Sequence, residues 1–271
     1  MGKERVKYAE NDTEHAQGER KISKPSLFWL LTETTRASIE YGLNIPYNLF
    51  NPHTGTGDGH PVLVLPGFMA SDVSTRPLRR FLSKCGYTSY GWELGRNYAQ
   101  EKFLDELIIR VEKLYLDHKQ KITLIGWSLG GIYARQVAKE RPHLIRQIIT
   151  MGSPFKALHK PNHAKWLHKI LTNGQGTDAV DPKLMEDIPL PAPVPTTAIY
   201  SKQDGIVPWN ACIESEDDIH QNVEVTGSHL GLGVNNTVLD IIADRLKYSK
   251  ENWVHYSGEE VGSKSFDICS A

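Results

Sequence analysis

The stretch KITLIGWSLGG, residues 121–131, decides the fold because an apolar, mostly β-branched run ends in a serine set among glycines. A helix-prone run, IYARQVAKE, follows at once. Side chains at Gly126 and Gly130 would collide in so tight a turn, which explains the glycines. A sharp strand-to-helix turn exposes the serine hydroxyl and aims the free N–H groups of the helix at it. The stretch therefore predicts Ser128 as a nucleophile.

Buried strands alternate with amphipathic helices on both sides of this turn. Strands are expected at 62–65, 87–94, 121–125, 197–201 and 222–226 and within 144–154, and helices at 25–43, 74–86, 101–118, 129–140 and 236–248. Strands that are apolar on both faces favour an α/β fold, with a mostly parallel sheet of about six strands and helices on both faces. Reactive groups are then expected at the carboxyl ends of the strands.

Two later strand ends carry groups that could activate the serine. Asp204, in IYSKQDGIVPW, follows one strand, and His229, in VTGSHLGLG, follows the next. A serine nucleophile needs a base and a group that orients the base, and in this kind of sheet the acid precedes the histidine. We therefore expect Asp204 as the acid and His229 as the base. The weaker competitors lie in an insertion, in an acidic loop or before a strand: Asp178, Asp181, Asp217, Asp218 and His220.

Backbone amides are the expected donors for the negatively charged oxygen that forms when a serine attacks a carbonyl. One is the amide of Leu129, directly after the nucleophile. The other should come from LPGFM, residues 65–69, where Pro66 has no N–H. Phe68 is the candidate and Met69 is the alternative.

The segments VLVLPGF, GWSLGG, TMGSP, YSKQDGIVPW and GSHLGLGVN together resemble the α/β-hydrolase family, and within it the bacterial lipases and esterases. They are distributed between about residues 60 and 245. The resemblance implies a Ser128–Asp204–His229 triad, with the Phe68 and Leu129 amides as oxyanion donors. It also implies cleavage of carboxylic esters through an acyl-enzyme, without a cofactor. The chain departs from many relatives in having Pro66-Gly67 where they have His-Gly before the oxyanion residue.

A long insertion, residues 155–195, separates two strands and is expected to form a cap over the site. Its Trp166 and Leu167, with Met69 and Trp127 near the turn, are candidate substrate contacts. His159 and His163 have the spacing of a metal pair, but too few other ligands are in view, so no metal is expected. A basic face of the cap, carrying Lys156, Lys160, Lys165 and Lys169, would meet solvent or an anionic substrate surface.

Composition and charge bound the rest of the expectations. A chain of 271 residues with a net charge of -1 gives no reason to expect nucleic acid as a partner. Residues 1–24 are expected to form a mobile polar arm, and residues 25–271 a single domain with the cap. Three cysteines without metal spacing and no apolar leader favour a cytoplasmic protein. The helix at 25–43 is expected to pack on the domain; peripheral membrane contact through it or through the cap is the alternative.

The expected substrate is a small-molecule or lipid ester. The same triad would also serve an acyltransferase or a thioesterase, since the triad does not determine which group accepts the acyl chain. A binding protein on the same scaffold is a third reading, which a missing triad member would have favoured. The sequence indicates no oligomeric state.

Overall fold

The structure, a computed structural model, describes residues 25–51, 53–100, 102–156 and 182–258. The predicted arm and the centre of the predicted cap, with Trp166 and Leu167, lie outside the described residues.

A six-stranded sheet forms the centre of the protein, with the strand order β2-β1-β3-β4-β5-β6. All five strand pairs are parallel. The strands are β1 (Pro61–Leu65), β2 (Thr88–Gly91), β3 (Ile122–Trp127), β4 (Ile145–Met151), β5 (Thr196–Tyr200) and β6 (His220–Glu224). The predicted α/β class and parallel sheet are confirmed. Parallel pairing brings the carboxyl ends of β3, β5 and β6 to one edge of the sheet.

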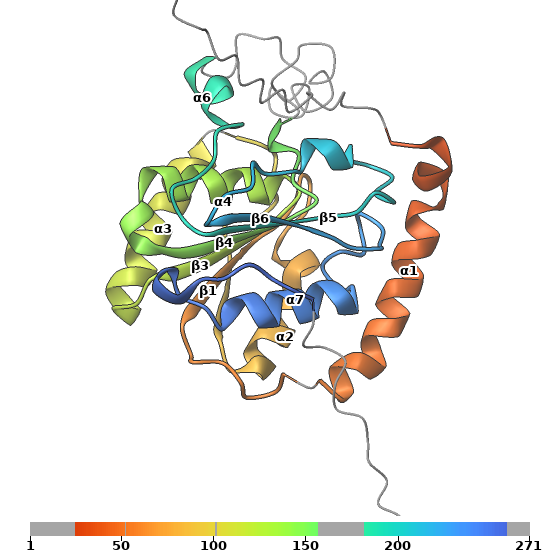
Figure 1. Ribbon diagram of the computed structural model, residues 1–271, viewed down its shortest axis with the longest axis horizontal. Coiled ribbons are helices and arrows are strands. Elements are labelled where there is room, and N and C mark those ends of the chain that lie inside the picture. Colours follow the sequence, from red (N-terminus) through yellow and green to blue (C-terminus); the bar gives the residue numbers. More distant parts are fainter. Residues whose placement is uncertain (1–24, 52, 101, 157–181, 259–271) are drawn as a thin grey trace, which may run out of the picture.

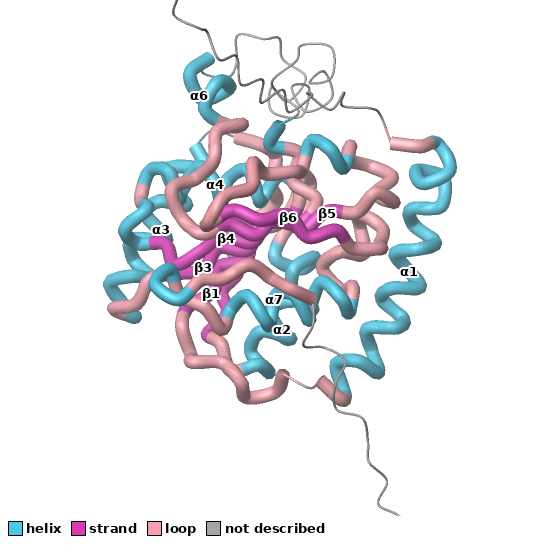
Figure 2. Tube along the Cα trace, viewed as in Figure 1, coloured by secondary structure: helices cyan, strands magenta, loops and turns pink. Residues whose placement is uncertain are grey.

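Helices cover both faces of this sheet, as Figures 1 and 2 show. The helices are α1 (Leu27–Leu49), α2 (Asp72–Cys85), α3 (Lys102–His118), α4 (Leu129–Glu140), α6 (Pro182–Asp187) and α7 (Asn236–Leu246). Among the described residues, short 3-10 helices lie at Pro142–Leu144, Trp209–Ala211 and Lys250–Asn252. In the described part of the chain, no helix combines the length and the apolarity that crossing a bilayer requires.

Two apolar cores lie on opposite faces of the sheet, and β1 supplies both. Leu63 and Leu65 pack with residues of α3 and α4, whereas Val62 and Val64 pack with residues of α2 and α7. All four side chains are buried. Alternate side chains of a strand point to opposite faces, so a strand covered on both sides must be apolar throughout. This is the pattern from which the parallel sheet was predicted.

Helix α1 lies on the outside of the molecule (Figure 1), beside the loops that follow β5 and β6. It packs on the domain as expected, but not through the apolar residues at its start. Leu27, Phe28 and Leu31 are 60 to 73% exposed, whereas Glu33 is 2% exposed. The helix instead meets the domain through polar side chains, because the loops beneath it present backbone N–H groups that need acceptors.

Candidate active site

Ser128 occupies the turn between β3 and α4 in a strained backbone conformation, with φ 53° and ψ −121°. Residues other than glycine rarely adopt a positive φ, and such strain gathers at functional sites. Two backbone hydrogen bonds fix the turn. The Ser128 amide donates to the Met151 carbonyl at 2.8 Å, and the Gly131 amide donates to the Ser128 carbonyl at 3.0 Å.

Three glycines make the turn possible. A Cβ atom on Gly126 would lie 2.3 Å from the Cα of Gly131, and one on Gly130 would lie 2.3 Å from the Leu65 carbonyl oxygen. These are the collisions expected from the sequence. Gly131 has the same requirement, which sequence reasoning missed: its Cβ would lie 2.0 Å from Ser153 Oγ.

Asp204 and His229 form a buried pair in the loops that follow β5 and β6. Asp204 Oδ2 lies 2.6 Å from His229 Nδ1, and each residue is 4% exposed. The other carboxylate oxygen, Oδ1, accepts the amides of Ile206 at 2.8 Å and Val207 at 2.6 Å. With Oδ1 engaged by these amides, Oδ2 is the acceptor for a proton on His229 Nδ1. The ring nitrogen Nε2 is then the one able to act as a base.

The serine turn and the histidine loop are in contact. The indole N–H of Trp127 donates to the His229 carbonyl at 3.0 Å. Gly152, which follows the acceptor of the Ser128 amide, lies so close that an added Cβ would be 3.0 Å from His229 Nδ1 and 3.2 Å from Asp204 Oδ2. The sheet edge thus brings Ser128, Asp204 and His229 together. Within the described residues, no hydrogen bond joins Ser128 Oγ to the histidine, and in unliganded enzymes this contact is often long.

Two other buried histidines also pair with aspartates, so pairing with an aspartate does not by itself identify His229 as the base. His220 Nδ1 contacts Asp217 at 2.8 Å, and its Nε2 contacts the Ala192 carbonyl at 2.8 Å. His60 bonds Asp58 through Nδ1 and Thr123 Oγ1 through Nε2. Both rings use both nitrogens to hold loops together. His229 Nε2, by contrast, has no hydrogen-bond partner in the described part of the chain.

The electrostatic environment favours the protonated form of His229. Burial by itself lowers the pKa of His229, but the charge of Asp204, its hydrogen bond and the charge of Glu33 outweigh burial and raise it above the ordinary value. A pair of this kind stabilises the imidazolium that forms when a histidine takes a proton from a serine.

The loop after β1 approaches the serine from the other side. A Cβ on Gly67 would lie 3.2 Å from the Cβ of Ser128. The Met69 amide already donates to the Asn97 carbonyl at 2.7 Å, so the alternative oxyanion donor is engaged. The Phe68 and Leu129 amides have no acceptor among the described residues, which leaves them available to a ligand.

The candidate substrate contacts differ in how far they are exposed. Trp127 is 7% exposed and packs in the core beside α7, so the structure does not support a substrate contact through it. Met69 is 54% exposed, and its contact with substrate stays a prediction. Trp166 and Leu167 lie outside the described residues. No group of three or more potential metal ligands occurs in the parts of the chain that the structure describes.

A cavity of about 620 Å³ opens beside the turn, between α3, α4 and α6. Leu129, the residue after the serine, is one of the residues that line it. Much of its wall is apolar and includes Ile132, Tyr133, Leu184 and Ile188. The volume is that of a pocket for a small organic ligand.

Sequence reasoning missed Glu33 and Glu40 of α1, which contact the loops that carry Asp204 and His229. A signal was present. Glu33, Ala37, Glu40, Asn44 and Tyr47 recur every three or four residues, and this face is the one that the structure buries or half-buries. A polar face at helical spacing is usually assigned to solvent, which is why it was overlooked.

Comparisons with known proteins show similarity to a family model and to a named serine hydrolase. A family model described as a PGAP1-like alpha/beta domain matches residues 93–169, which include the serine turn. The human protein named Serine hydrolase BPHL is 28% identical over 133 residues, or 45% of this chain and 44% of that protein. The chain therefore matches less than half the length of this relative.

Solved structures share the same architecture. Lipase B of Aspergillus fumigatus superposes with a TM-score of 0.56 at 17% identity, over 73% of this chain and 55% of that one. A structure of the metagenome-derived lipolytic enzymes LipS and LipT has a TM-score of 0.54 at 15% identity, over 72% of this chain and 96% of that one. The mature Bacillus licheniformis lipase BlEst2 has a TM-score of 0.52 at 17% identity, over 72% of this chain and 93% of that one. At such identities these likenesses establish the fold.

Proposed function

The chain has the α/β-hydrolase fold, and on this premise we propose that it is a serine hydrolase that cleaves carboxylic esters through an acyl-enzyme. The observation that carries the proposal is the strained Ser128 turn at the same sheet edge as the buried Asp204–His229 pair. The lipase and esterase neighbours and the human serine hydrolase support a hydrolase.

The proposed reaction follows from the atoms at this edge. Ser128 Oγ attacks the ester carbonyl while His229 Nε2 takes its proton. Asp204 holds the ring in the required tautomer and stabilises the imidazolium. The Phe68 and Leu129 amides donate to the oxyanion. The imidazolium then protonates the departing alcohol, and a water molecule activated by the same histidine releases the acid. No step in this sequence calls for a metal or an organic cofactor.

The cavity beside Leu129 supports a substrate with an apolar acyl group. An acyl chain lying there could reach the Leu129 amide with its carbonyl, because Leu129 lines the cavity. The geometry would equally serve transfer of the acyl group to an alcohol or its release from a thioester. Adding alcohols or thioesters to the reaction and measuring product ratios distinguishes these activities from hydrolysis.

The test is the substitution Ser128→Ala. We expect hydrolysis of nitrophenyl esters to fall by roughly three to six orders of magnitude, the range for loss of a triad member. The circular dichroism spectrum should be unchanged, and labelling by a fluorophosphonate probe should disappear.

The matched control is Ser38→Ala, because Ser38 lies on the exposed side of α1. It should keep both activity and labelling. A Ser128→Ala protein that still turns over esters at near the wild-type rate would refute the proposal. Absence of labelling and turnover in the wild type would favour a binding protein on this scaffold.

A further inference from the structure

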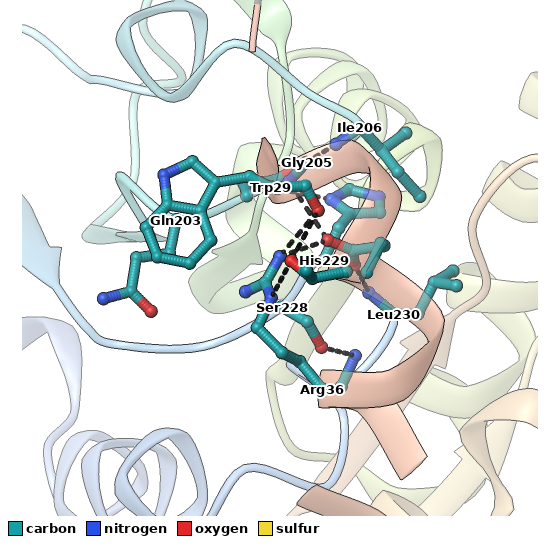
Figure 3. A network of polar contacts seen from close by, with 12 residues as sticks. Trp29, Arg36, Gln203, Gly205, Ile206, Ser228, His229 and Leu230 are labelled. Atoms are coloured by element: carbon teal, nitrogen blue, oxygen red, sulfur yellow. Dashed lines mark hydrogen bonds and ion pairs between the residues drawn. The ribbon is translucent and has the colours of Figure 1, made fainter. Parts of the chain in front are cut away.

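Helix α1 carries its charged side chains toward the catalytic loops. Over residues 26–50 the only charged residues are Glu33, Arg36 and Glu40, and each is buried or half-buried. Figure 3 shows Trp29 and Arg36 lying against the loops that contain Gly205, Ile206, Ser228 and Leu230. An outer helix normally buries its apolar face and exposes its charges. The reversed arrangement indicates that the surface beneath the helix presents polar groups that the charged side chains bind.

Glu33 joins the two loops that carry the candidate acid and base. Its Oε2 accepts the amide of Gly205 at 3.1 Å, and its Oε1 accepts the amide of Leu230 at 2.8 Å. Gly205 directly follows Asp204, and Leu230 directly follows His229. One carboxylate therefore fixes the spacing between the backbones of the two residues whose side chains must meet.

Arg36 compensates the negative charge of this buried carboxylate. Its Nη2 lies 2.9 Å from Glu33 Oε2, and it also donates to the Trp29 carbonyl at 3.0 Å. A buried charge is stable when it is both paired and hydrogen-bonded. Glu33, which is 2% exposed, meets both conditions.

Glu40 holds the other side of the histidine. Its Oε1 accepts the Ser228 amide at 2.9 Å, and its Oε2 accepts the Ser228 hydroxyl. The loop glycines leave room for this approach. A Cβ on Gly231 would lie 1.4 Å from Glu40 Oε2, and one on Gly205 would lie 2.4 Å from the Trp29 carbonyl oxygen. The residues before and after His229 are thus both anchored to α1.

We propose that Glu33 and Glu40 are positioning residues, which hold the Asp204 and His229 loops in the arrangement that the reaction needs. The proposal rests on the proposed serine-hydrolase function. Neither glutamate touches the reacting atoms; each acts through the backbone of the loop that it holds. A displacement of about 1 Å in a catalytic group can reduce a rate by about a hundredfold, so the contacts are expected to matter for turnover.

The same geometry gives Glu33 an electrostatic effect that Glu40 lacks. The groups that act on the charge of His229 are Asp204, after β5, and Glu33, on α1. Arg36 pairs with Glu33, Glu40 binds Ser228 on the same loop, and the Cys212 thiol beside Asp204 is buried. Of the two glutamates, only Glu33 is among the groups that raise the pKa of His229.

The experiment compares Glu33→Gln, Glu33→Asp and Glu40→Gln in the full chain, with Glu112→Gln as a matched control. Glu112 pairs with Arg141 on the surface, far along the sequence from both catalytic loops. Rates are measured with a soluble nitrophenyl ester and divided by the concentration of active sites, which is titrated with a fluorophosphonate. The Nε2 and Nδ1 shifts of His229 are followed by NMR across pH.

A glutamine at 33 presents an NH2 group to one of the two amides, so one loop loses its anchor. We expect kcat per active site to fall about 10- to 100-fold, with KM within about threefold. The pKa of His229 should also fall, because the carboxylate charge is gone. Glu33→Asp should lower kcat through its shorter reach while the pKa of His229 stays closer to that of the wild type. Glu40→Gln should lower kcat without moving this pKa.

A merely structural role for α1 predicts something else. The loss of activity would then equal the loss of active sites that react with the fluorophosphonate. The kcat per active site and the pKa of His229 would be unchanged, and this result would overturn the proposal. If Glu33→Gln does not fold, Glu33→Asp and Glu40→Gln decide the matter. If the wild type cleaves no ester, the serine-hydrolase function fails, whereas the NMR titration still reports whether Glu33 acts on His229.

Discussion

The buried Asp204–His229 pair determines how the protein should respond to pH. The base must be neutral to take a proton from Ser128, and an unperturbed histidine titrates near ~6.5. Asp204 and Glu33 raise the pKa of His229. Turnover of a soluble ester should therefore decline as the pH falls through a midpoint above ~6.5. A profile of kcat/KM against pH measures this midpoint. A midpoint well below 6.5 would contradict the described pairing.

Two aspartates that both contact a histidine provide a matched pair of substitutions. Asp204→Asn should keep the fold but leave His229 in the wrong tautomer, which lowers kcat by about 10⁴. Asp217→Asn breaks a similar contact to His220, but Asp217 is 54% exposed and His220 already bonds the Ala192 carbonyl. Its kcat should stay within about threefold of the wild type. Steady-state kinetics of the two variants decides which aspartate is the acid.

At the level of elements, the close contact between α1 and the Asp204 loop can be tested through glycines. A Cβ on Gly205 would meet backbone atoms of Trp29 and Leu30 at 2.4 to 2.7 Å, so the helix or the loop must move. We expect Gly205→Ala to lower the free energy of unfolding by about 1–3 kcal/mol. Gly42, on the exposed side of α1, has no atom within 4 Å of its added Cβ.

Gly42→Ala is therefore the control for the same helix. It removes a flexible residue from a helix interior and should raise the free energy of unfolding by about 0.5–1 kcal/mol. Urea denaturation measures both variants. Equal stabilities for the two alanine variants would show that α1 does not press on the loop.

The strands and most helices were predictable because each depends on local patterning. The strands β1 and β3 are mostly apolar and buried throughout, since both faces are covered, and α4 begins at the residue expected. The face of α1 was not predictable in the same way. Its burial depends on amides at positions 205, 228 and 230, which lie far along the chain. Hydrophobic periodicity carries no information about backbone N–H groups in distant loops that need acceptors.

Over the whole molecule, the candidate site was predictable as far as parallel topology governs it. Strand ends that are distant in sequence meet at one sheet edge, so order and spacing were enough to nominate Ser128, Asp204 and His229. The sequence already put Phe68 before Met69, but the hydrogen bond from the Met69 amide to the Asn97 carbonyl, which supports this order, is seen only in the structure. Contacts between Gly152 and the pair likewise arise only when β4 is set beside β5.

The outward face of α1 bears on the predicted peripheral membrane contact. No charged side chain is exposed over residues 26–50 of the described chain, whereas ten large apolar residues are. These are Leu27, Phe28, Leu30, Leu31, Ile39, Tyr41, Leu43, Ile45, Leu49 and Phe50. Next to the end of this face, Ile206 and Leu230 are partly exposed on the catalytic loops. A lipid surface bound here would lie beside the site where an ester is expected to react.

Contact of this kind would be apolar, because the face lacks the lysines and arginines that attract anionic lipids. We therefore predict that the protein binds uncharged phosphatidylcholine vesicles and that raising the salt concentration does not release it. Replacing Leu27 and Leu31 together by serine should abolish cosedimentation with the vesicles and leave hydrolysis of a short, soluble ester unchanged. Leu116→Ser, on α3, removes a leucine that is 60% exposed elsewhere and should bind as the wild type does. If the wild type does not bind vesicles but self-associates, and the double variant is monomeric, the face is an interface between copies of the chain.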